Sequence, residues 1–424
     1  MIDTDTIAAC ATAWGHAAVA VVRVSGPDAC AAAATVVGRL PGPRSVVLRR
    51  FRDRDGVFDE GLVTWFPGPH SYTGEDVVEL SGHGNPLLVE RLLRALPARP
   101  ARPGEFTRRA FLHGRLDLTR AEAVLATLEA TSGRGLELAR HAAGGQIADE
   151  AEALRVAIVD VAAELEAALD YPGEDLLVDD DAKLAARLRT LASRAREVAA
   201  TWQAGRVAIQ GARVVLAGPV NAGKSSLFNA LVGRDRAIVS PTAGTTRDAL
   251  EVAVQWDAVR VVLVDTAGER DSTDAIEAEG VRRAREERAG ADLVLRCVPP
   301  GELVPPAGAG ELVVPTMADL AARPGAVSAR SGEGLAALRE AITEAGAGRP
   351  QASVGAVLTS ARQAELFTTV ARQLDEAAAA LGFAGAAVAV ELGYAALESL
   401  AELSGSSVRE GVLDRLFARF CIGK

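Results

Sequence analysis

The chain has 424 residues and a formal net charge of −10 at pH 7; hydrophobic residues make up 49% of it and aromatic residues only 4%. This length predicts two to four domains. The negative charge argues against a basic coat for nucleic acid, and the scarcity of aromatic side chains argues against base stacking as the main mode of binding. The four cysteines lie far apart and the five histidines show no metal-ligand spacing, so neither a disulfide framework nor a zinc site is expected.

The N-terminus has no basic segment followed by an apolar one, so no signal peptide is expected. No apolar run reaches the roughly 20 residues that span a bilayer. We therefore expect a cytoplasmic protein with no membrane association. Lysine is rare in this chain, which has only Lys183, Lys224 and Lys424. A lysine in a motif is accordingly informative.

Four regions follow one another along the chain. Residues 1–115 contain short apolar runs separated by Pro and Gly, which predict a mixed α/β domain. Residues 116–205 predict long helices, from their apolar residues at helical spacing. Residues 206–345 alternate strands with helices, which predicts a mostly parallel sheet covered by helices. Residues 346–424 are helical again. We therefore expect the sheet-containing region, 206–345, to be inserted into one helical domain whose two halves, 116–205 and 346–424, pack together.

One helix of the second region should end at Tyr171, where Tyr-Pro-Gly breaks the helical pattern. An acidic stretch, 174–181, follows and is expected to be a solvated loop and helix N-terminus. The predicted buried face of the helix consists of Leu154, Ile158, Val161, Leu165 and Leu169.

A phosphate-binding loop is predicted at Gly218-Pro-Val-Asn-Ala-Gly-Lys-Ser225, which matches G-x-x-x-x-G-K-[ST] between an apolar strand and a helix. Glycines let backbone N–H groups surround phosphates, and the helix N-terminus adds a favourable dipole. Lys224 would reach the β- and γ-phosphates, and the Ser225 hydroxyl would bind Mg²⁺. The other nucleotide-binding residues predicted in this loop are Asn221, Ala222, Gly223 and Ser226.

Two later segments have the order and spacing of GTPase switches. Gly244-Thr-Thr-Arg-Asp248 offers threonines to Mg²⁺, and Thr246 is the favoured ligand. Asp265 would hold Mg²⁺ through water, and the Gly268 N–H would contact the γ-phosphate. The D-x-x-G motif alone is weak evidence, but after a phosphate loop it indicates a GTPase. This predicted nucleotide-binding set is Gly244, Thr245, Thr246, Asp265, Thr266, Ala267 and Gly268.

The base-reading motif is altered. GTPases usually carry Asn-Lys-x-Asp, in which the Asn braces the site and the Lys stem covers the base; this chain has Thr316-Met-Ala-Asp319. Asp319 would accept hydrogen bonds from guanine N1–H and the exocyclic amine, a donor pair that adenine lacks. We expect GTP rather than ATP, with weakened guanine affinity. The last guanine-binding loop is predicted at Ser328, Ala329 and Arg330.

Seven further motifs span the chain. They are Asp5-Thr-Ile, Phe66-Pro-Gly-Pro, Tyr72-Thr-Gly-Glu-Asp, Gly82-His-Gly, Arg102-Pro-Gly-Glu-Phe-Thr, Leu116-Asp-Leu-Thr-Arg-Ala-Glu-Ala and the terminal Cys421-Ile-Gly-Lys. With these motifs the chain resembles the MnmE (TrmE) family of tRNA-modifying GTPases over essentially its whole length. The resemblance implies a homodimer that joins the FAD-containing MnmG protein in a heterotetramer. Together such proteins place an aminomethyl or carboxymethylaminomethyl group on C5 of the wobble uridine of tRNA.

The resemblance also implies a folate site in the N-terminal domain, which would serve for dimerisation as well. The one-carbon unit of the reaction would come from a 5-formyl- or methylene-tetrahydrofolate. The residues implied for folate binding are Arg23, Glu79, Arg115 and Lys424. Arg115 stands where the family usually has Lys, which keeps the charge but changes its geometry. Cys421 would lie near the folate as a candidate reactive thiol.

The resemblance further implies that K⁺ replaces an arginine finger when two G domains meet. The implied K⁺ ligands are Asn221, Ser240, Thr242 and Thr245. Glu277 matches the glutamate with which the family orients the attacking water. The predicted catalytic residues are therefore Glu277, Lys224 and Thr246.

Two other interpretations stay open from the sequence. The chain would be a GTP-switch assembly factor, for example one acting on ribosomes, if nucleotide state only controlled docking. It would be a folate-binding protein with a decayed G domain if the altered Thr316-Met317 pair had abolished nucleotide binding. The folate-type motifs argue against the first interpretation, and the intact Lys224, Ser225, Thr246 and Asp265 argue against the second.

Overall fold

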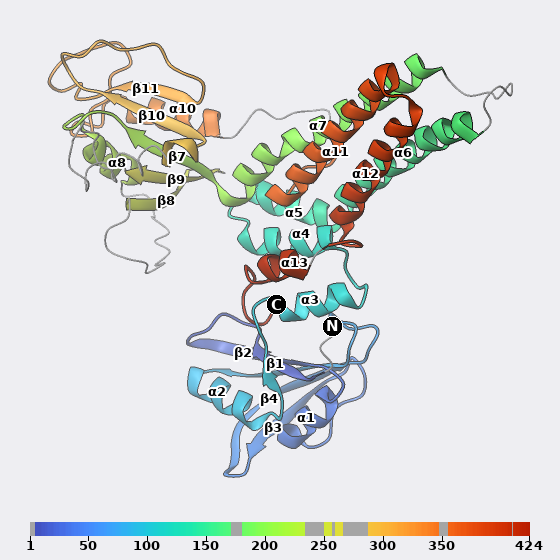
Figure 1. Cartoon of the computed structure of the whole chain (residues 1–424). Coiled ribbons are helices and arrows are strands. Elements are labelled where there is room, and N and C mark those ends of the chain that lie inside the picture. The colour runs from blue at the N-terminus through green and yellow to red at the C-terminus, as the bar shows by residue number, and fades with distance from the viewer. Residues whose placement is uncertain are drawn as a thin grey trace, which may run out of the picture. The chain divides into compact units, whose positions relative to one another are not determined.

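The computed structural model of the chain (Figure 1) describes residues 5–170, 180–233, 250–256, 259–265, 287–346, 355–408 and 410–424. The chain divides into two compact units, which consist of residues 1–125, 143–191 and 372–424 in the first and 126–142 and 192–371 in the second. Among the described residues, four helices contribute to both units: α4 (Leu118–Glu129), α5 (Gly133–Ala143), α7 (Asp181–Gln210) and α11 (Ala361–Phe383). The division into four regions expected from the sequence, with boundaries near residues 115, 205 and 345, stays a prediction.

The first unit contains a six-stranded sheet of order β3-β4-β5-β2-β1-β6, antiparallel except for the β1–β6 pair. Its strands are β1 (Ile7–Cys10), β2 (Ala17–Ser25), β3 (Val46–Asp53), β4 (Gly56–Phe66), β5 (Val77–Gly84) and β6 (Arg99–Pro100). Strands β2, β4 and β5 follow apolar runs that the sequence makes evident. Strand β3, with the sequence VVLRRFRD, is not evident from the sequence, because charged residues predominate after Leu48.

The two faces of this sheet carry different side chains. Helices α1 (Ala29–Val37) and α2 (Pro86–Ala95) share one core with Val22 and Val24 of β2 and with Val78 and Leu80 of β5. Ile7 and Ala9 of β1 instead pack with Phe106 of α3 (Glu105–Leu112) on the opposite face. Side chains alternate between faces along a strand. Arg23, between two core valines, and Glu79, between two core residues, therefore lie on the α3 face.

The C-terminal segment returns to this part of the first unit. Helix α13 (Glu410–Phe417) packs in an apolar cluster with Leu118 and Ala121 of α4. Gly104, just before α3, has a φ of 66°, and a Cβ there would lie 2.4 Å from the carbonyl oxygen of Phe417. Only glycine permits this approach. The chain end consequently lies beside α3, as Figure 1 shows.

A pair of long helices completes the first unit. Helix α6 (Gln146–Asp170) packs against α12 (Ala386–Ser404), and the Tyr394 hydroxyl donates to Glu166 at 2.8 Å. The predicted buried face of α6 is confirmed except at Leu169, which is 44% exposed because it lies in the last turn, where the helix ends. No helix in the described part of the chain is long and apolar enough to cross a membrane.

The second unit contains a five-stranded sheet of order β11-β10-β7-β9-β8. The predicted mostly parallel sheet is confirmed: only the β8–β9 pair is antiparallel. Its core contains aliphatic residues that alternate along the strands, such as Val214, Leu216, Leu263 and Leu295. Apolar side chains of helices α8 and α10 pack against them. The elements are β7 (Ala212–Ala217), β8 (Leu250–Trp256), β9 (Val259–Asp265), β10 (Leu293–Val298), β11 (Glu311–Pro315), α5 (Gly133–Ala143), α8 (Lys224–Val232) and α10 (Leu335–Gly346).

Replacement of Gly61 tests the close pairing of β4 with β5. A Cβ at Gly61 would lie 2.1 Å from the Ser81 carbonyl oxygen, so Gly61→Ala must push two paired strands apart. We expect a loss of about 2 kcal/mol or more in the free energy of unfolding, measured by urea denaturation. Gly393→Ala is the control, because a Cβ at this position in α12 meets no atom within 4 Å. Alanine should stabilise that helix by up to about 1 kcal/mol. Equal stability of Gly61→Ala and the unmodified chain would contradict the strand geometry.

Candidate functional site

The loop between β7 and α8 has the backbone conformation that phosphate binding requires. Gly218 and Gly223 have φ angles of 143° and 80°, and Asn221 is left-handed with a φ of 63°. A Cβ at Gly218 would lie 2.5 Å from the carbonyl oxygen of Cys297, so the first loop position accepts only glycine. Successive residues of opposite hand turn backbone N–H groups toward a common concavity, which suits an anion.

Lys224 and Ser225 begin α8 at the end of this loop. Lys224 is 7% exposed, and its Nζ donates to the carbonyl oxygens of Gly218 and Pro219 at 2.9 and 2.8 Å. The ammonium group thus lies over the loop, where the β- and γ-phosphates of a nucleotide are expected. Ser225 is exposed in the first turn of α8, and its hydroxyl is accessible to a metal ion.

Asp265 is the last residue of β9 and pairs in register with Leu216, two residues before the phosphate loop. Its Oδ1 atom is buried and accepts no hydrogen bond from any residue that the structure describes. A buried carboxylate oxygen needs a partner, and Mg²⁺ with its waters prefers such oxygen ligands. The Ser225 hydroxyl and the Asp265 carboxylate therefore fit a magnesium site.

Several predicted residues lie outside the described residues. They are Ser240, Thr242, Gly244, Thr245, Thr246, Thr266, Ala267, Gly268 and Glu277. Within the ranges that the structure describes, no group of three or more His, Cys, Asp or Glu residues is arranged to hold a metal ion. Cys297 lies beside the phosphate loop, and burial raises the pKa of its thiol to about 12, so it is a neutral core residue.

The base-reading segments meet at a cavity of about 420 Å³. Asp319 is exposed and lines it, and its Oδ1 accepts a hydrogen bond of 2.7 Å from the Ser328 hydroxyl. Ser328 is fully buried and in turn accepts from the backbone N–H groups of Arg330 and Ser331. This chain of bonds orients the Asp319 carboxylate, which keeps lone pairs for a ligand. The residues that line the cavity are Gly223, Ser226, Leu227, Thr316, Met317, Asp319, Leu320, Val327, Ala329 and Arg330.

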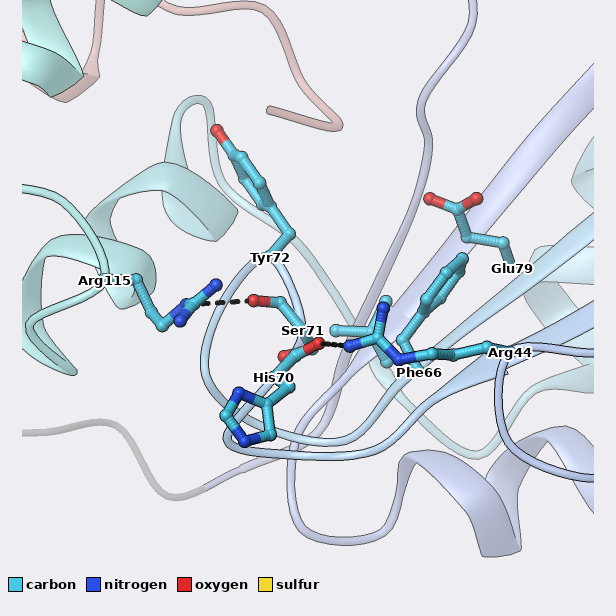
Figure 2. A pocket seen from close by; sticks show the side chains of 8 residues that line it. Arg44, Phe66, His70, Ser71, Tyr72, Glu79 and Arg115 are labelled. Atoms are coloured by element: carbon cyan, nitrogen blue, oxygen red, sulfur yellow. Dashed lines mark hydrogen bonds between the residues drawn. The ribbon is translucent and has the colours of Figure 1, made fainter. Parts of the chain in front are cut away.

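A second cavity, of about 490 Å³, lies in the first unit on the α3 face of the sheet. Arg115 donates through Nε to the Ser71 carbonyl oxygen at 3.1 Å, and Arg44 donates to the His70 carbonyl oxygen. Figure 2 shows the Glu79 carboxylate on the opposite side of the cavity from Arg115. The cavity is lined by Arg44, Phe66, His70, Ser71, Tyr72, Val77, Glu79 and Arg115.

Two of the predicted folate residues, Glu79 and Arg115, thus line one cavity. Sequence reasoning missed Arg44 and His70, which also line this cavity and add a guanidinium and an imidazole to its lining. The sequence does contain an indication for His70, because it lies between the family motifs that begin at Phe66 and at Tyr72. A loop that joins two such motifs is a natural place for residues of a binding site. Arg44 lies in no motif; it stands two residues before β3, and its backbone N–H donates to the Trp65 carbonyl oxygen of β4 at 2.7 Å.

Arg23 connects Glu79 to the end of the chain. Its Nε and Nη2 donate to Glu79 Oε1 at 3.0 and 2.8 Å, and its Nη1 donates to the Gly423 carbonyl oxygen at 3.2 Å. The guanidinium lies 5.3 Å from the ring centroid of Tyr72 and 5.7 Å from that of Phe106. At these distances the aromatic rings stabilise its positive charge. The structure therefore brings Arg23 and Glu79 next to the residue before Lys424. Cys421, three residues before the end, is exposed.

A buried ion cluster supports the loop that forms the cavity wall. Arg109 is 2% exposed and donates to Asp5 Oδ1 at 2.6 Å, to Glu105 Oε1 at 3.2 Å and to both oxygens of Glu75 at 3.2 Å. Hydrogen bonds from Arg99 and Arg109 lower the pKa of Asp5 to about 2, against the effect of burial. Glu75 follows Tyr72 in the cavity loop, so Arg109 ties that loop to α3 and to the start of β1.

Comparison with protein families assigns both parts of the chain. The model described as the GTP-binding protein TrmE N-terminus matches residues 6–115, and the model of the MnmE helical domain matches residues 118–421. The chain belongs to the MnmE (TrmE) family. Curated relatives match this chain over 99 to 100% of both chains.

Three of these relatives are each named tRNA modification GTPase MnmE. The protein of Methylobacterium radiotolerans is 43% identical and covers 100% of both chains. That of Myxococcus xanthus is 42% identical and covers 99% of both chains. That of Methylorubrum populi is 44% identical and covers 100% of this chain and 99% of its own.

Removal of the Arg109 guanidinium tests the ion cluster. Arg109→Met would remove the cation that contacts Asp5, Glu75 and Glu105, and of these three described carboxylates only Asp5 and Glu105 would keep their ion pairs with Arg99. We expect a loss of about 3 kcal/mol or more in the free energy of unfolding, measured in urea. Arg50→Met removes an ion pair whose Arg50 side chain is 69% exposed, and it should change stability by less than about 0.5 kcal/mol. A similarly small change in Arg109→Met would rule out the supporting role.

Proposed function

We propose that the chain hydrolyses GTP and takes part in the modification of tRNA, as the name of its relatives states for them. The observation that carries this proposal is the full-length match to the MnmE family in a chain that has an intact phosphate loop. The oriented carboxylate of Asp319 in the neighbouring cavity supports guanine as the base.

The residues of the second unit would divide the work of hydrolysis. Backbone N–H groups of the loop hold the phosphates, and Lys224 exchanges its two carbonyl partners for β- and γ-phosphate oxygens. Ser225 and Thr246 would ligate Mg²⁺, and Asp265 would hold it through water; when bound, the ion would supply positive charge to the phosphates. Gly268 would contact the γ-phosphate, and Glu277 would orient the attacking water.

A potassium ion is proposed at the same phosphates, with ligands from Asn221, Ser240, Thr242 and Thr245. The left-handed backbone and exposed side chain of Asn221 support its role, because the amide oxygen is accessible. Bound K⁺ would supply the positive charge that an arginine finger supplies elsewhere. Dimerisation of G domains would complete its ligand set.

The cavity of the first unit is proposed to bind a 5-formyl- or methylene-tetrahydrofolate, which would supply the one-carbon unit. The Glu79 carboxylate would accept hydrogen bonds from the N–H edge of the pterin, and Arg115 and Lys424 would attract the glutamate carboxylates. Arg23 would hold Glu79 and the chain end in position. Cys421 would lie near the folate as the candidate thiol. The proposed assembly is a cytoplasmic homodimer that joins the FAD protein MnmG in a heterotetramer acting on tRNA.

Steady-state hydrolysis in KCl and in NaCl at equal ionic strength tests the GTPase proposal. GTP should turn over at least about tenfold faster in KCl, since the ion adds transition-state stabilisation, and ATP should not be hydrolysed. Lys224→Ala should abolish turnover because it removes the phosphate-binding cation. Lys183→Ala, which changes another of the three lysines, is the control and should leave the rate within about twofold.

The outcomes separate the parts of this proposal. Equal rates in the two salts would contradict the potassium site and leave GTP hydrolysis in place. Equal hydrolysis of ATP would contradict guanine recognition. If the unmodified chain shows no turnover of GTP in either salt, and Lys224→Ala shows the same lack of activity, the result would favour the interpretation of a decayed G domain.

Calorimetric binding of 5-formyltetrahydrofolate tests the cavity of the first unit. Glu79→Gln and Arg115→Ala should each weaken binding about tenfold or more, because each removes a charged hydrogen-bonding group from the cavity wall. Arg94→Ala, which removes an exposed ion pair on α2, should bind as the unmodified chain does. A complete lack of folate binding by the unmodified chain would favour the GTP-switch assembly factor.

A further inference from the structure

The loop after β11 departs from the usual base-reading sequence at two positions, Thr316 and Met317. The usual Asn has two polar groups, and the usual Lys is a long cation. Threonine and methionine offer only a hydroxyl and an uncharged thioether. The positions of these two side chains nevertheless relate them to the nucleotide site.

Thr316 connects the base-reading loop to the phosphate loop. It is 3% exposed, and its backbone N–H donates to the Val298 carbonyl oxygen at 3.0 Å. Its Oγ1 lies 2.7 Å from the carbonyl oxygen of Ala222 and 3.3 Å from that of Val298. A hydroxyl has one proton, and the shorter contact is the better hydrogen bond. This buried bond therefore joins two loops whose residues are 94 positions apart.

Met317 lies against the start of α8. Its φ of 59° is left-handed, which an unbranched side chain adopts only where the surroundings hold it. Its carbonyl oxygen accepts from the N–H groups of Leu320 and Ala321, so a turn fixes this conformation. A Cβ added at Gly223 would lie 3.3 Å from Met317 Cε. The thioether thus forms a wall of the cavity that Asp319 also lines.

We propose that Thr316 and Met317 perform in this chain the two tasks of the usual Asn and Lys. Thr316 is a positioning residue that fixes the base-reading loop to the phosphate loop, and Met317 covers a face of the guanine base. A polarisable thioether makes favourable contacts with aromatic rings and carries no charge to desolvate. This inference rests on the proposed binding of GTP and specifies how the chain retains guanine without the usual pair.

Equilibrium binding of a fluorescent GDP to the full chain in Mg²⁺ tests the role of Thr316. Thr316→Val keeps the shape of the side chain and removes the hydroxyl, which leaves the Ala222 carbonyl oxygen without this donor. We expect binding about tenfold weaker, whereas Thr316→Ser, which keeps the hydroxyl, should stay within about twofold of the unmodified chain. Thermal melting without nucleotide shows whether each variant is folded. Unchanged binding by a folded Thr316→Val would overturn the positioning role.

The dissociation rate of the same fluorescent GDP, measured beside its equilibrium binding, tests Met317 with a second pair of variants. Met317→Ala should release GDP about fivefold faster because it uncovers the base, and Met317→Leu, which preserves an apolar cover, should differ by less than about twofold. The double variant Thr316→Asn with Met317→Lys restores the usual pair and should bind GDP at least as tightly as the unmodified chain. Release from Met317→Ala at the unmodified rate would overturn the covering role.

Asp319→Asn separates failure of this inference from failure of GTP binding. An amide in place of the carboxylate offers a donor where guanine also has donors, so binding should change from GDP to xanthosine diphosphate. That change, with Thr316→Val and Met317→Ala binding GDP normally, would overturn only the roles of Thr316 and Met317. Undiminished GDP binding by Asp319→Asn would show that the cavity does not read guanine, and the proposed function would lose its base assignment.

Discussion

The cluster around the buried Arg109 guanidinium is the contact on which the cavity of the first unit depends. It joins Asp5 at the start of β1, Glu105 on α3 and Glu75 in the cavity loop. A buried guanidinium is tolerated only when several acceptors surround it, and here three carboxylates do so. The three segments are therefore held in one arrangement, and the loop that contains Tyr72 keeps its place beneath Arg23.

Strand alternation supplies the second constraint in that unit. The residues that face α1 and α2 are aliphatic, so the residues between them are presented to the α3 face, where Arg23 and Glu79 pair across β2 and β5. The chain end reaches this face because Gly104 and Gly423 permit backbone approaches that a Cβ would block. A carboxylate, several cationic groups and the terminal segment thus surround a single region, and this combination suits a ligand with both an N–H edge and carboxylates.

In the second unit the same local physics builds a nucleotide site. Glycines at both ends of the phosphate loop allow a backbone that other residues would strain, and the N-terminus of α8 adds its dipole. Thr316 and Met317, the departures from the usual base-reading motif, line the same cavity as Gly223 of the phosphate loop. Thr316 supplies there a hydrogen bond to the phosphate loop, and Ser328 orients Asp319. The altered loop is consequently well braced, which is difficult to reconcile with a decayed nucleotide domain.

The sequence by itself determined the features that depend on neighbours in the chain. The phosphate loop, the parallel sheet around it, the breaking of α6 before Tyr171 and the family motifs all follow from residue type and spacing over short stretches. Strand β3 was missed because its charged residues hide the apolar alternation that is typical of a strand. The exposure of Leu169 was missed because the apolar spacing of a helix does not show which of its residues lie in an exposed last turn.

Only the tertiary structure decided which distant residues meet. Arg23 reaches Glu79, 56 positions later, and Gly423, 400 positions later, while the Thr316 hydroxyl reaches the phosphate loop. The participation of Arg44 in the cavity of the first unit and the central place of Arg109 are of the same kind. Such contacts depend on how the elements pack, because strand register and the approach of loops bring together side chains that lie far apart in the sequence. The local spacing of residue types gives no information about these pairs.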